Sequence, residues 1–178
     1  GDEIIVPSLC YISPIHMIKL LGATPIIADV NSDSYQICPI NIQKKISKKT
    51  KAILMIHNYG SVCGYKDICK VANKKGIQII EDMSETIFSK INNIFLGSNK
   101  SKKTKIISFS SLHSTKTITT GEGGIIFTNS NKISENFASH MEVKSGKETI
   151  VKEELFRDLS ASDKAQIQCG TAQRHPHL

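Results

Sequence analysis

Short apolar segments of strand length alternate along this chain with segments whose apolar residues recur at helical spacing. The pattern predicts strands over residues 4–6, 25–30, 52–56, 77–81, 105–109 and 124–128. It predicts helices over about 13–21, 39–46 and 65–75, and from about residue 132 onward. Because a helix between two strands acts as a crossover, successive strands should lie parallel in one sheet with helices on both faces. The predicted fold class is therefore α/β, with a mainly parallel sheet flanked by helices.

Polar residues follow three of the predicted strands, at the point where each strand ends. They are residues 57–60, the pair Glu81 and Asp82, and residues 110–116. In open sheets of this kind, ligands bind just beyond the carboxyl ends of the strands. We therefore expect a functional site to be assembled from these three segments.

Size and cysteine spacing exclude several classes of protein. The 178 residues are enough for one domain with its own core, and no apolar stretch is long enough to span a membrane. None of the five cysteines has the CxxC spacing of a zinc or redox motif, so we expect no metal site. The chain shows no signal-peptide pattern, which favours a cytoplasmic protein with reduced thiols and no membrane contact.

The formal net charge of +7 could attract nucleic acid or a phosphorylated ligand. However, the lysines are scattered between apolar segments, and no aromatic residues interleave with them as in a surface that binds single strands. A solvated surface is favoured by roughly three to one. We therefore expect no nucleic-acid partner, because that interpretation rests on charge alone.

Lys116 lies in a segment rich in hydroxyl residues and glycines, residues 114–124 (STKTITTGEGG). A lysine amine can form a Schiff base with an aldehyde when its neutral form is accessible. The small residues around Lys116 would leave room for a cofactor and supply donors for a phosphate. The same composition fits a hairpin loop or a phosphate nest, and it gives the functional interpretation about even odds.

Asp82 and Tyr11 each have a functional and a structural interpretation. At the end of a strand, the carboxylate of Asp82 could pair with a protonated pyridine nitrogen, but a helix N-cap is favoured roughly two to one. Tyr11 could stack on a flat ring, although a core tyrosine is the commoner explanation for an aromatic residue after a strand.

The order of these motifs resembles that of the DegT/StrS-type nucleotide-sugar aminotransferases, which use pyridoxal phosphate and have the aspartate-aminotransferase fold. Residues 1–8 (GDEIIVPS) are similar to the family's GDEVIVPS, and TKAI at 50–53 with HNYG at 57–60 is similar to TKAI and HLYG. Residues 80–85 (IEDMSE) resemble IEDAAE, and 116–124 (KTITTGEGG) match the end of SFFGNKTITTGEGG. The resemblance implies that residues 1–145 form part of the large, cofactor-binding domain of a fold-type I enzyme.

The resemblance also implies a role for each of five residues. Lys116 would hold pyridoxal 5'-phosphate covalently and move a proton between substrate and cofactor, and Asp82 would bind the pyridine nitrogen. Tyr11 would stack on the cofactor ring, Ser111 would contact its phosphate, and Glu85 would lie near its hydroxyl group.

Residues 116–124 are similar to those of perosamine synthases, a subfamily that aminates a GDP-linked 4-keto-6-deoxy sugar with glutamate. The resemblance therefore implies transamination of such a nucleotide sugar, with glutamate as amino donor, in a homodimer whose active sites lie at the interface. The alternative is a non-catalytic relative that binds the cofactor or the nucleotide sugar without turnover.

Several parts of the family pattern are replaced or absent. Family members are considerably longer, so we expect a fragment without the family's GTxAL phosphate turn and small C-terminal domain. Residues 146–178 would form a divergent, disordered tail, in which 159–161 (LSA) stand where the family has NYR, whose asparagine reaches the partner's cofactor. Residues 112–114 (LHS) replace the usual aromatics and glycine. The fragment alone is therefore expected to lack full activity.

Overall fold

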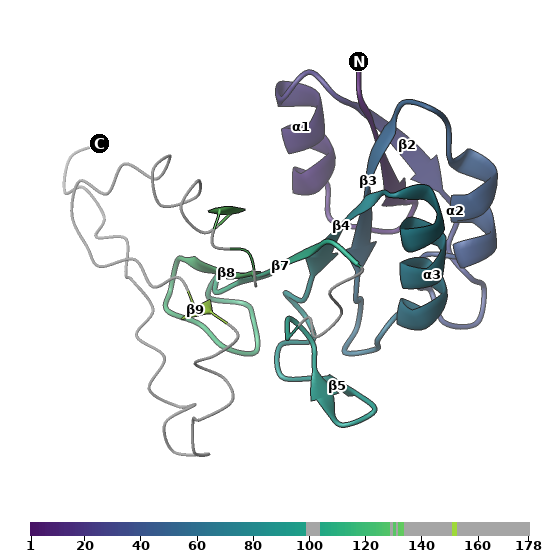
Figure 1. Cartoon of the computed structure of the whole chain (residues 1–178). Coiled ribbons are helices and arrows are strands. Elements are labelled where there is room, and N and C mark those ends of the chain that lie inside the picture. Colours follow the sequence, from purple (N-terminus) through teal and green to yellow (C-terminus); the bar gives the residue numbers. More distant parts are fainter. Residues whose placement is uncertain (99–103, 129, 131, 134–150, 153–178) are drawn as a thin grey trace.

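A computed structural model of the chain describes residues 1–98, 104–128, 130, 132, 133, 151 and 152. Its main feature is a seven-stranded sheet with the order β2-β1-β3-β4-β7-β8-β9 (Figure 1). The strands are β1 (Glu3–Pro7), β2 (Thr24–Ala28), β3 (Thr50–Ile56), β4 (Gln78–Asp82), β7 (Ile106–Ser111), β8 (Gly124–Thr128) and β9 (Val151–Lys152).

Neighbouring strands from β2 to β7 pair in parallel, whereas β8 runs antiparallel to β7. Each parallel pair is joined through a crossover, as the alternation of apolar segments predicts. The prediction of an α/β fold with a mainly parallel, mixed sheet is therefore confirmed.

The helices are α1 (Ser13–Leu20), α2 (Pro39–Lys45) and α3 (Tyr65–Lys75), close to their predicted bounds. Proline occupies the first turn of α1 and of α2, where its fixed φ suits a helix start and its missing N–H removes no helical hydrogen bond. Gly76 ends α3 at a φ of 66°, in the left-handed region that glycine enters without steric penalty.

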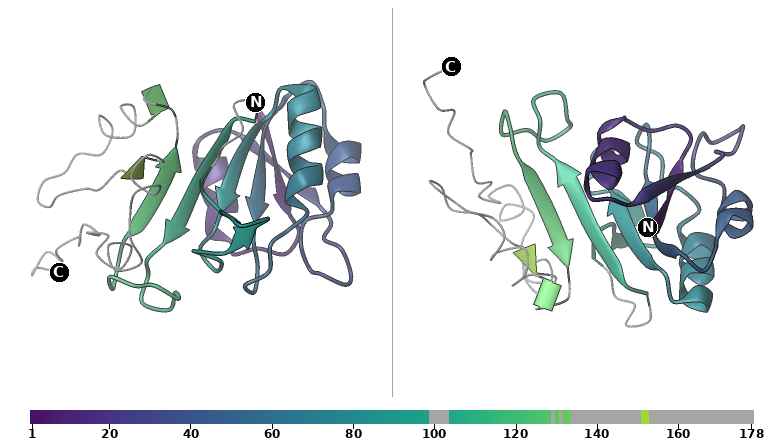
Figure 2. Two further views of the ribbon diagram at one scale, coloured as in Figure 1. Left: turned by 60° about the horizontal axis from the view of Figure 1, so that its bottom comes forward. Right: turned by 90° about the horizontal axis from the view of Figure 1, so that it is seen from above.

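Different helices cover the two faces of the sheet (Figure 2). On one face, Ile53 and Met55 of β3 belong to a buried cluster with residues of α2 and α3. On the other face, Leu54 and Ile56 of the same strand pack with Ile18 of α1. Because successive side chains of a strand point to opposite faces, each central strand contributes to both cores.

Two local features differ from the sequence prediction. The sequence predicts that the first strand ends at Val6, before a proline, but Pro7 is the last residue of β1 and pairs with Ala28, beyond the residues of β1 that pair with β3. A small hairpin of β5 (Lys90–Ile91) and β6 (Ile94–Phe95) was not predicted, because two-residue strands give no periodic signal.

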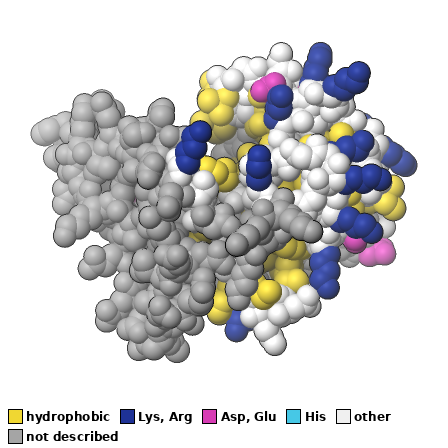
Figure 3. Space-filling model, in the orientation of Figure 1, with side chains coloured by type: hydrophobic (Ala, Val, Ile, Leu, Met, Phe, Trp, Pro, Cys, Tyr) yellow, Lys and Arg dark blue, Asp and Glu magenta, His cyan; other side chains and the backbone are white. Residues whose placement is uncertain are grey.

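The predicted domain boundary at residue 145 lies outside the described residues, as does most of the predicted tail and of the helix after residue 132. Within the part of the chain that is described, no helix has the length and apolar character needed to cross a membrane. Lysine side chains are spread over the described part of the face in Figure 3, with uncharged surface between most of them.

Candidate active site

The carboxyl ends of the parallel strands bring all of the predicted site residues to one edge of the sheet. Tyr11 follows β1, Asp82 is the last residue of β4, and Ser111 is the last residue of β7. Glu85 lies in the turns after β4, and Lys116 lies in the loop between β7 and β8. These residues therefore lie where the sequence predicts the site, just beyond the carboxyl ends of the strands.

Asp82 is 9% exposed and lies on the sheet face that carries α1, because it alternates with Ile80 of that core. The backbone N–H of Ser84 donates a hydrogen bond of 2.9 Å to its Oδ1. Burial raises the pKa of Asp82, and the hydrogen bonds from Ser84 and the charge of Lys116 oppose this rise. No helix begins in the turns that follow, so the N-cap interpretation of Asp82 is wrong.

Ser84 connects Asp82 to the neighbouring strand. Its Oγ accepts a hydrogen bond of 3.0 Å from the backbone N–H of Ser111, while its own N–H binds Asp82. The Oγ of Ser111 accepts a hydrogen bond of 3.3 Å from the N–H of His113. The motif comparison assigned no role to Ser84, although it lies within the IEDMSE segment.

Lys116 and Glu85 form a second contact across the site. The Nζ of Lys116 lies 3.8 Å from Glu85 Oε1, and the side chains are 27% and 42% exposed. The other oxygen of Glu85 accepts a hydrogen bond of 2.7 Å from the backbone N–H of Tyr59. Glu85 therefore links the loop of Lys116 to the loop after β3, which the sequence placed at this edge without assigning Tyr59 a role.

Hydrogen bonds within the loop define its shape around Lys116. The carbonyl of Leu112 accepts hydrogen bonds of 3.0 Å from the N–H of Thr120 and from the hydroxyl of Thr119. Thr119 Oγ1 also accepts a hydrogen bond of 2.9 Å from the N–H of Gly121. The segment is thus a hairpin loop between antiparallel strands, as one of its interpretations predicts, and threonine side chains stabilise it.

The side chain of Tyr11 is 78% exposed, so its interpretation as a core residue is wrong. The loop that carries it lies beside Asp82. The pKa of the neighbouring Cys10 is raised mainly by burial and to a smaller extent by the charge of Asp82. Asn58 Nδ2 donates a hydrogen bond of 3.1 Å to the carbonyl of Leu9, which connects this loop to the one after β3.

A buried polar cluster lies on the opposite face of the sheet, directly behind Asp82. The carboxylate of Glu81 accepts hydrogen bonds from His57 Nε2 at 3.1 Å, from the N–H of Gly97 at 3.2 Å and from the hydroxyl of Ser108. The N–H of Cys63 donates to His57 Nδ1, so the proton of the neutral ring is on Nε2 and points to Glu81. The sequence places His57 and Glu81 at the same sheet edge, but it does not predict that they form a buried pair.

Comparison with known proteins identifies the chain's relatives. A model of the DegT/DnrJ/EryC1/StrS aminotransferase family matches residues 1–158. The chain belongs to this family. The seven-stranded sheet and Lys116 in the β7–β8 loop therefore belong to a chain of an aminotransferase family.

Two similar proteins are GDP-perosamine synthases. The one from Escherichia coli O157:H7 is 41% identical over 129 residues, which cover 72% of this chain and 34% of that protein. The one from Vibrio cholerae is 35% identical over 133 residues, which cover 75% of this chain and 35% of that protein. The chain therefore spans about a third of the length of these relatives.

Solved structures of similar proteins have the same fold. DesV of S. venezuelae matches with a TM-score of 0.75 and 25% identity, over 82% of this chain and 38% of that one. GDP-4-keto-6-deoxymannose-3-dehydratase (ColD) with bound GDP-perosamine matches with a TM-score of 0.68 and 26% identity, over 75% and 33% of the two chains. The predicted family and the predicted fold are both confirmed.

The residues at the sheet edge fit the cofactor of this aminotransferase family. Pyridoxal phosphate requires a primary amine, an acidic partner for its ring nitrogen and donors for its phosphate. Among the described residues, no lysine, arginine or histidine forms an ion pair with Asp82. A buried carboxylate with a raised pKa and no ion pair is therefore present where a cationic nitrogen would stabilise its charge.

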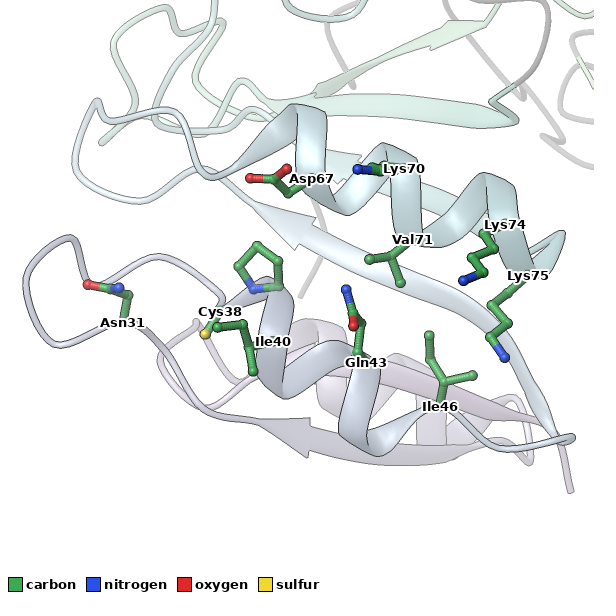
Figure 4. Close-up of a pocket in the computed structure, with 11 residues that line it drawn as sticks. Asn31, Cys38, Ile40, Gln43, Ile46, Asp67, Lys70, Val71, Lys74 and Lys75 are labelled. Carbon is green, nitrogen blue, oxygen red and sulfur yellow. The ribbon is translucent and has the colours of Figure 1, made fainter.

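Other candidate sites in the described part of the chain do not include the predicted site residues. No group of three or more His, Cys, Asp or Glu side chains among the described residues could hold a metal ion. A groove of about 670 Å³ between α2 and α3 is lined by apolar residues such as Ile40 and Val71 and by charged residues of α3, namely Asp67, Lys70, Lys74 and Lys75 (Figure 4). None of the predicted site residues lines it.

Proposed function

We propose that this chain is the cofactor-binding part of a pyridoxal-phosphate-dependent aminotransferase that acts on a nucleotide-linked sugar. The observation that carries the proposal is the convergence of Lys116 and Asp82 at one sheet edge, where burial raises the pKa of Asp82 and the charge of Lys116 opposes this rise. The membership in an aminotransferase family supports it.

Lys116 and Asp82 have complementary roles in this proposal. Pyridoxal phosphate, when bound, supplies an electron sink that allows a C–H bond beside the substrate nitrogen to ionise. The amine of Lys116 holds the cofactor and then carries the proton on Nζ. The carboxylate of Asp82 would keep the ring nitrogen protonated. The burial of Asp82 favours this role, because the attraction between opposite charges is stronger away from water.

The remaining site residues orient the cofactor and the lysine. Ser111, held by Ser84, offers its hydroxyl to the phosphate. The exposed ring of Tyr11 is available to stack on the cofactor ring. Glu85 would lie near the cofactor hydroxyl and would direct the amine of Lys116, since its Oε1 is 3.8 Å from Nζ.

We propose a GDP-linked 4-keto-6-deoxy sugar as the amino acceptor and glutamate as the amino donor, in a cytoplasmic homodimer. The two GDP-perosamine synthases among the relatives support this choice of acceptor, as does the GDP-perosamine bound to the structurally similar dehydratase. Glutamate and the homodimer come from the family resemblance.

The half-reaction with glutamate tests this function. The chain is loaded with pyridoxal phosphate, mixed with glutamate, and followed by absorbance for conversion of the cofactor to its amine form. The proposed function predicts conversion with production of 2-oxoglutarate, and no conversion in Lys116→Ala. A loaded chain that does not convert the cofactor would instead support a non-catalytic binding relative.

A further inference from the structure

The loop of residues 57–60, after β3, is fixed to its neighbours by hydrogen bonds. The N–H of His57 donates to the carbonyl of Asp82 at 3.2 Å. The side chain of Gln36 binds both the N–H and the carbonyl of Asn58, at 3.2 Å and 2.9 Å. Together with the bond from Tyr59 to Glu85, these contacts determine the backbone of the loop at the edge of the site.

Tyr59 has an unfavourable conformation within this loop. Its φ is 57°, in the left-handed region where the Cβ atom of a non-glycine residue is crowded by the backbone. Its side chain is 71% exposed, so packing in the core does not compensate for the strain. Strain of this kind persists where the surroundings enforce it, and it is concentrated at functional sites.

Tyr59 is one side chain away from the candidate cofactor lysine. Glu85 accepts the N–H of Tyr59 with Oε2 and lies 3.8 Å from the Nζ of Lys116 with Oε1. In the proposed function, the sugar carbon would receive the amino group from the cofactor that Lys116 holds, so the substrate must bring its sugar, rather than its nucleotide, to this position. The group that would meet the ring of Tyr59 is therefore the sugar.

We infer that Tyr59 is a specificity-determining residue whose exposed ring packs against the sugar of the nucleotide-sugar substrate. The inference rests on the proposed function, because it takes the sugar to be the group that approaches Lys116. An aromatic face is suited to the apolar C–H face of a deoxy sugar, and the hydroxyl of tyrosine remains free for a polar contact.

Tyr35 provides a matched control for Tyr59. Its φ is 55° and its side chain is 55% exposed, so it shares the unusual backbone and the exposed ring. Its N–H donates to the carbonyl of Asn31 at 2.8 Å, within the loop between β2 and α2. In the described part of the chain it forms no hydrogen bond or ion pair with Glu85 or Lys116, so it should share the strain without the function.

The experiment compares Tyr59→Gly, Tyr59→Phe and Tyr35→Gly with the parent chain. Thermal unfolding and the affinity for pyridoxal phosphate are measured first. GDP-perosamine is then titrated by calorimetry into the cofactor-loaded and the cofactor-free protein. The Tm of each glycine variant should lie no more than about 2 °C below that of the parent, because glycine relieves the strain at positive φ.

Tyr59→Gly should weaken GDP-perosamine binding by about ten-fold or more, while its affinity for the cofactor stays within about two-fold of the parent. Tyr35→Gly should change neither affinity, and Tyr59→Phe should keep binding within about three-fold because the ring remains. Equal binding by Tyr59→Gly and the parent would overturn the inference. A parent that does not bind GDP-perosamine, or equal losses of both ligands in Tyr59→Gly, would also overturn it.

Failure of the proposed function has a different signature. A parent chain that takes up no pyridoxal phosphate contradicts that function, whatever the variants do. The titration of the cofactor-free chain still tests Tyr59 in that case, since it measures contact with the sugar directly.

Discussion

Two adjacent carboxylates at the end of β4 have opposite environments. Glu81 is fully buried on the side of α3, and three donors of the protein surround it. Asp82 faces the side of α1, is 9% exposed, and has Ser84 as its hydrogen-bond donor, without an ion pair among the described residues. The same strand end therefore carries one acid that several donors of the fold satisfy and one that the fold satisfies only in part.

This difference separates a structural role from a ligand-binding role. The donors around Glu81 replace the water that it loses on folding, so its charge stabilises the cluster. Burial without equivalent donors raises the pKa of Asp82, which means that its charge opposes folding until a cation approaches. A carboxylate that the fold leaves partly unsatisfied is the better candidate for a bound ligand.

The largest expected effect is on the satisfied acid. Glu81→Gln places an amide N–H₂ among donors and should lower the free energy of unfolding by about 3 kcal/mol, measured by urea denaturation. The matched control is Glu122→Gln, whose side chain is 59% exposed and 3.8 Å from His113. This control should change stability by less than about 0.5 kcal/mol. Equal stability of the two variants would remove the distinction between Glu81 and an ordinary surface acid.

The pairing of His57 with Glu81 predicts a strong coupling between them. In a double-mutant cycle of His57→Leu and Glu81→Leu, the double variant should lose about 2 kcal/mol less free energy of unfolding than the two single variants lose together. Each single variant leaves a buried polar partner without its hydrogen bond, whereas the double variant removes both. Additive losses in urea denaturation would show that the pair acts as two independent residues.

Asp82→Asn should have the opposite effect and raise the free energy of unfolding. The pKa of Asp82 is higher in the folded chain than its ordinary value of 3.8, so folding favours the protonated carboxyl group. The stability that this protonated group contributes is fully present below pH 3.8 and is lost as pH rises through the folded pKa. In the cofactor-free chain the asparagine variant should therefore be more stable by about 1 kcal/mol at pH 7, with little difference at about pH 3.

Urea denaturation at the two pH values, without cofactor, measures this effect. The same variant should bind pyridoxal phosphate less tightly than the parent, because the ring nitrogen loses its anionic partner. A variant that is less stable than the parent at pH 7 would show that Asp82, like Glu81, is a structural acid.

The smallest effect is expected at Glu85. Its contact with Lys116 is partly exposed on both sides, so Glu85→Gln should change the free energy of unfolding by less than about 0.5 kcal/mol. The amide oxygen can still accept the N–H of Tyr59, which keeps the loop after β3 in place. A loss comparable to that of Glu81→Gln would mean that Glu85 supports the fold rather than the site.

The strand and helix pattern was predictable because it depends on burial, which apolar periodicity records directly. The edge with Asp82 and Lys116 was predictable for the same reason, since it follows from where parallel strands end. Periodicity cannot record hydrogen bonds between segments that are distant in sequence. Ser84 meets the N–H of Ser111 because β4 lies beside β7, and that neighbourhood follows from the strand order.

The comparison of Glu81 with Asp82 illustrates the same limit. In the sequence they are two acids at the end of one apolar strand, and the alternation of faces separates them only when the register is known. Ser108 satisfies Glu81 because the two residues are register partners in β7 and β4. The positive φ of Tyr59 is likewise not indicated by its residue type, and the hydrogen bond from its N–H goes to Glu85 of another loop.

Chemical trapping of the cofactor tests the central claim most directly. The chain is incubated with pyridoxal phosphate, treated with sodium borohydride, digested, and mapped by mass spectrometry, with Lys116→Ala and the α3 surface variant Lys66→Ala as companions. The account predicts that the reduced cofactor is attached to the peptide with Lys116 in the parent and in Lys66→Ala, and is absent from Lys116→Ala. Attachment spread over many lysines, or unchanged in Lys116→Ala, would contradict it.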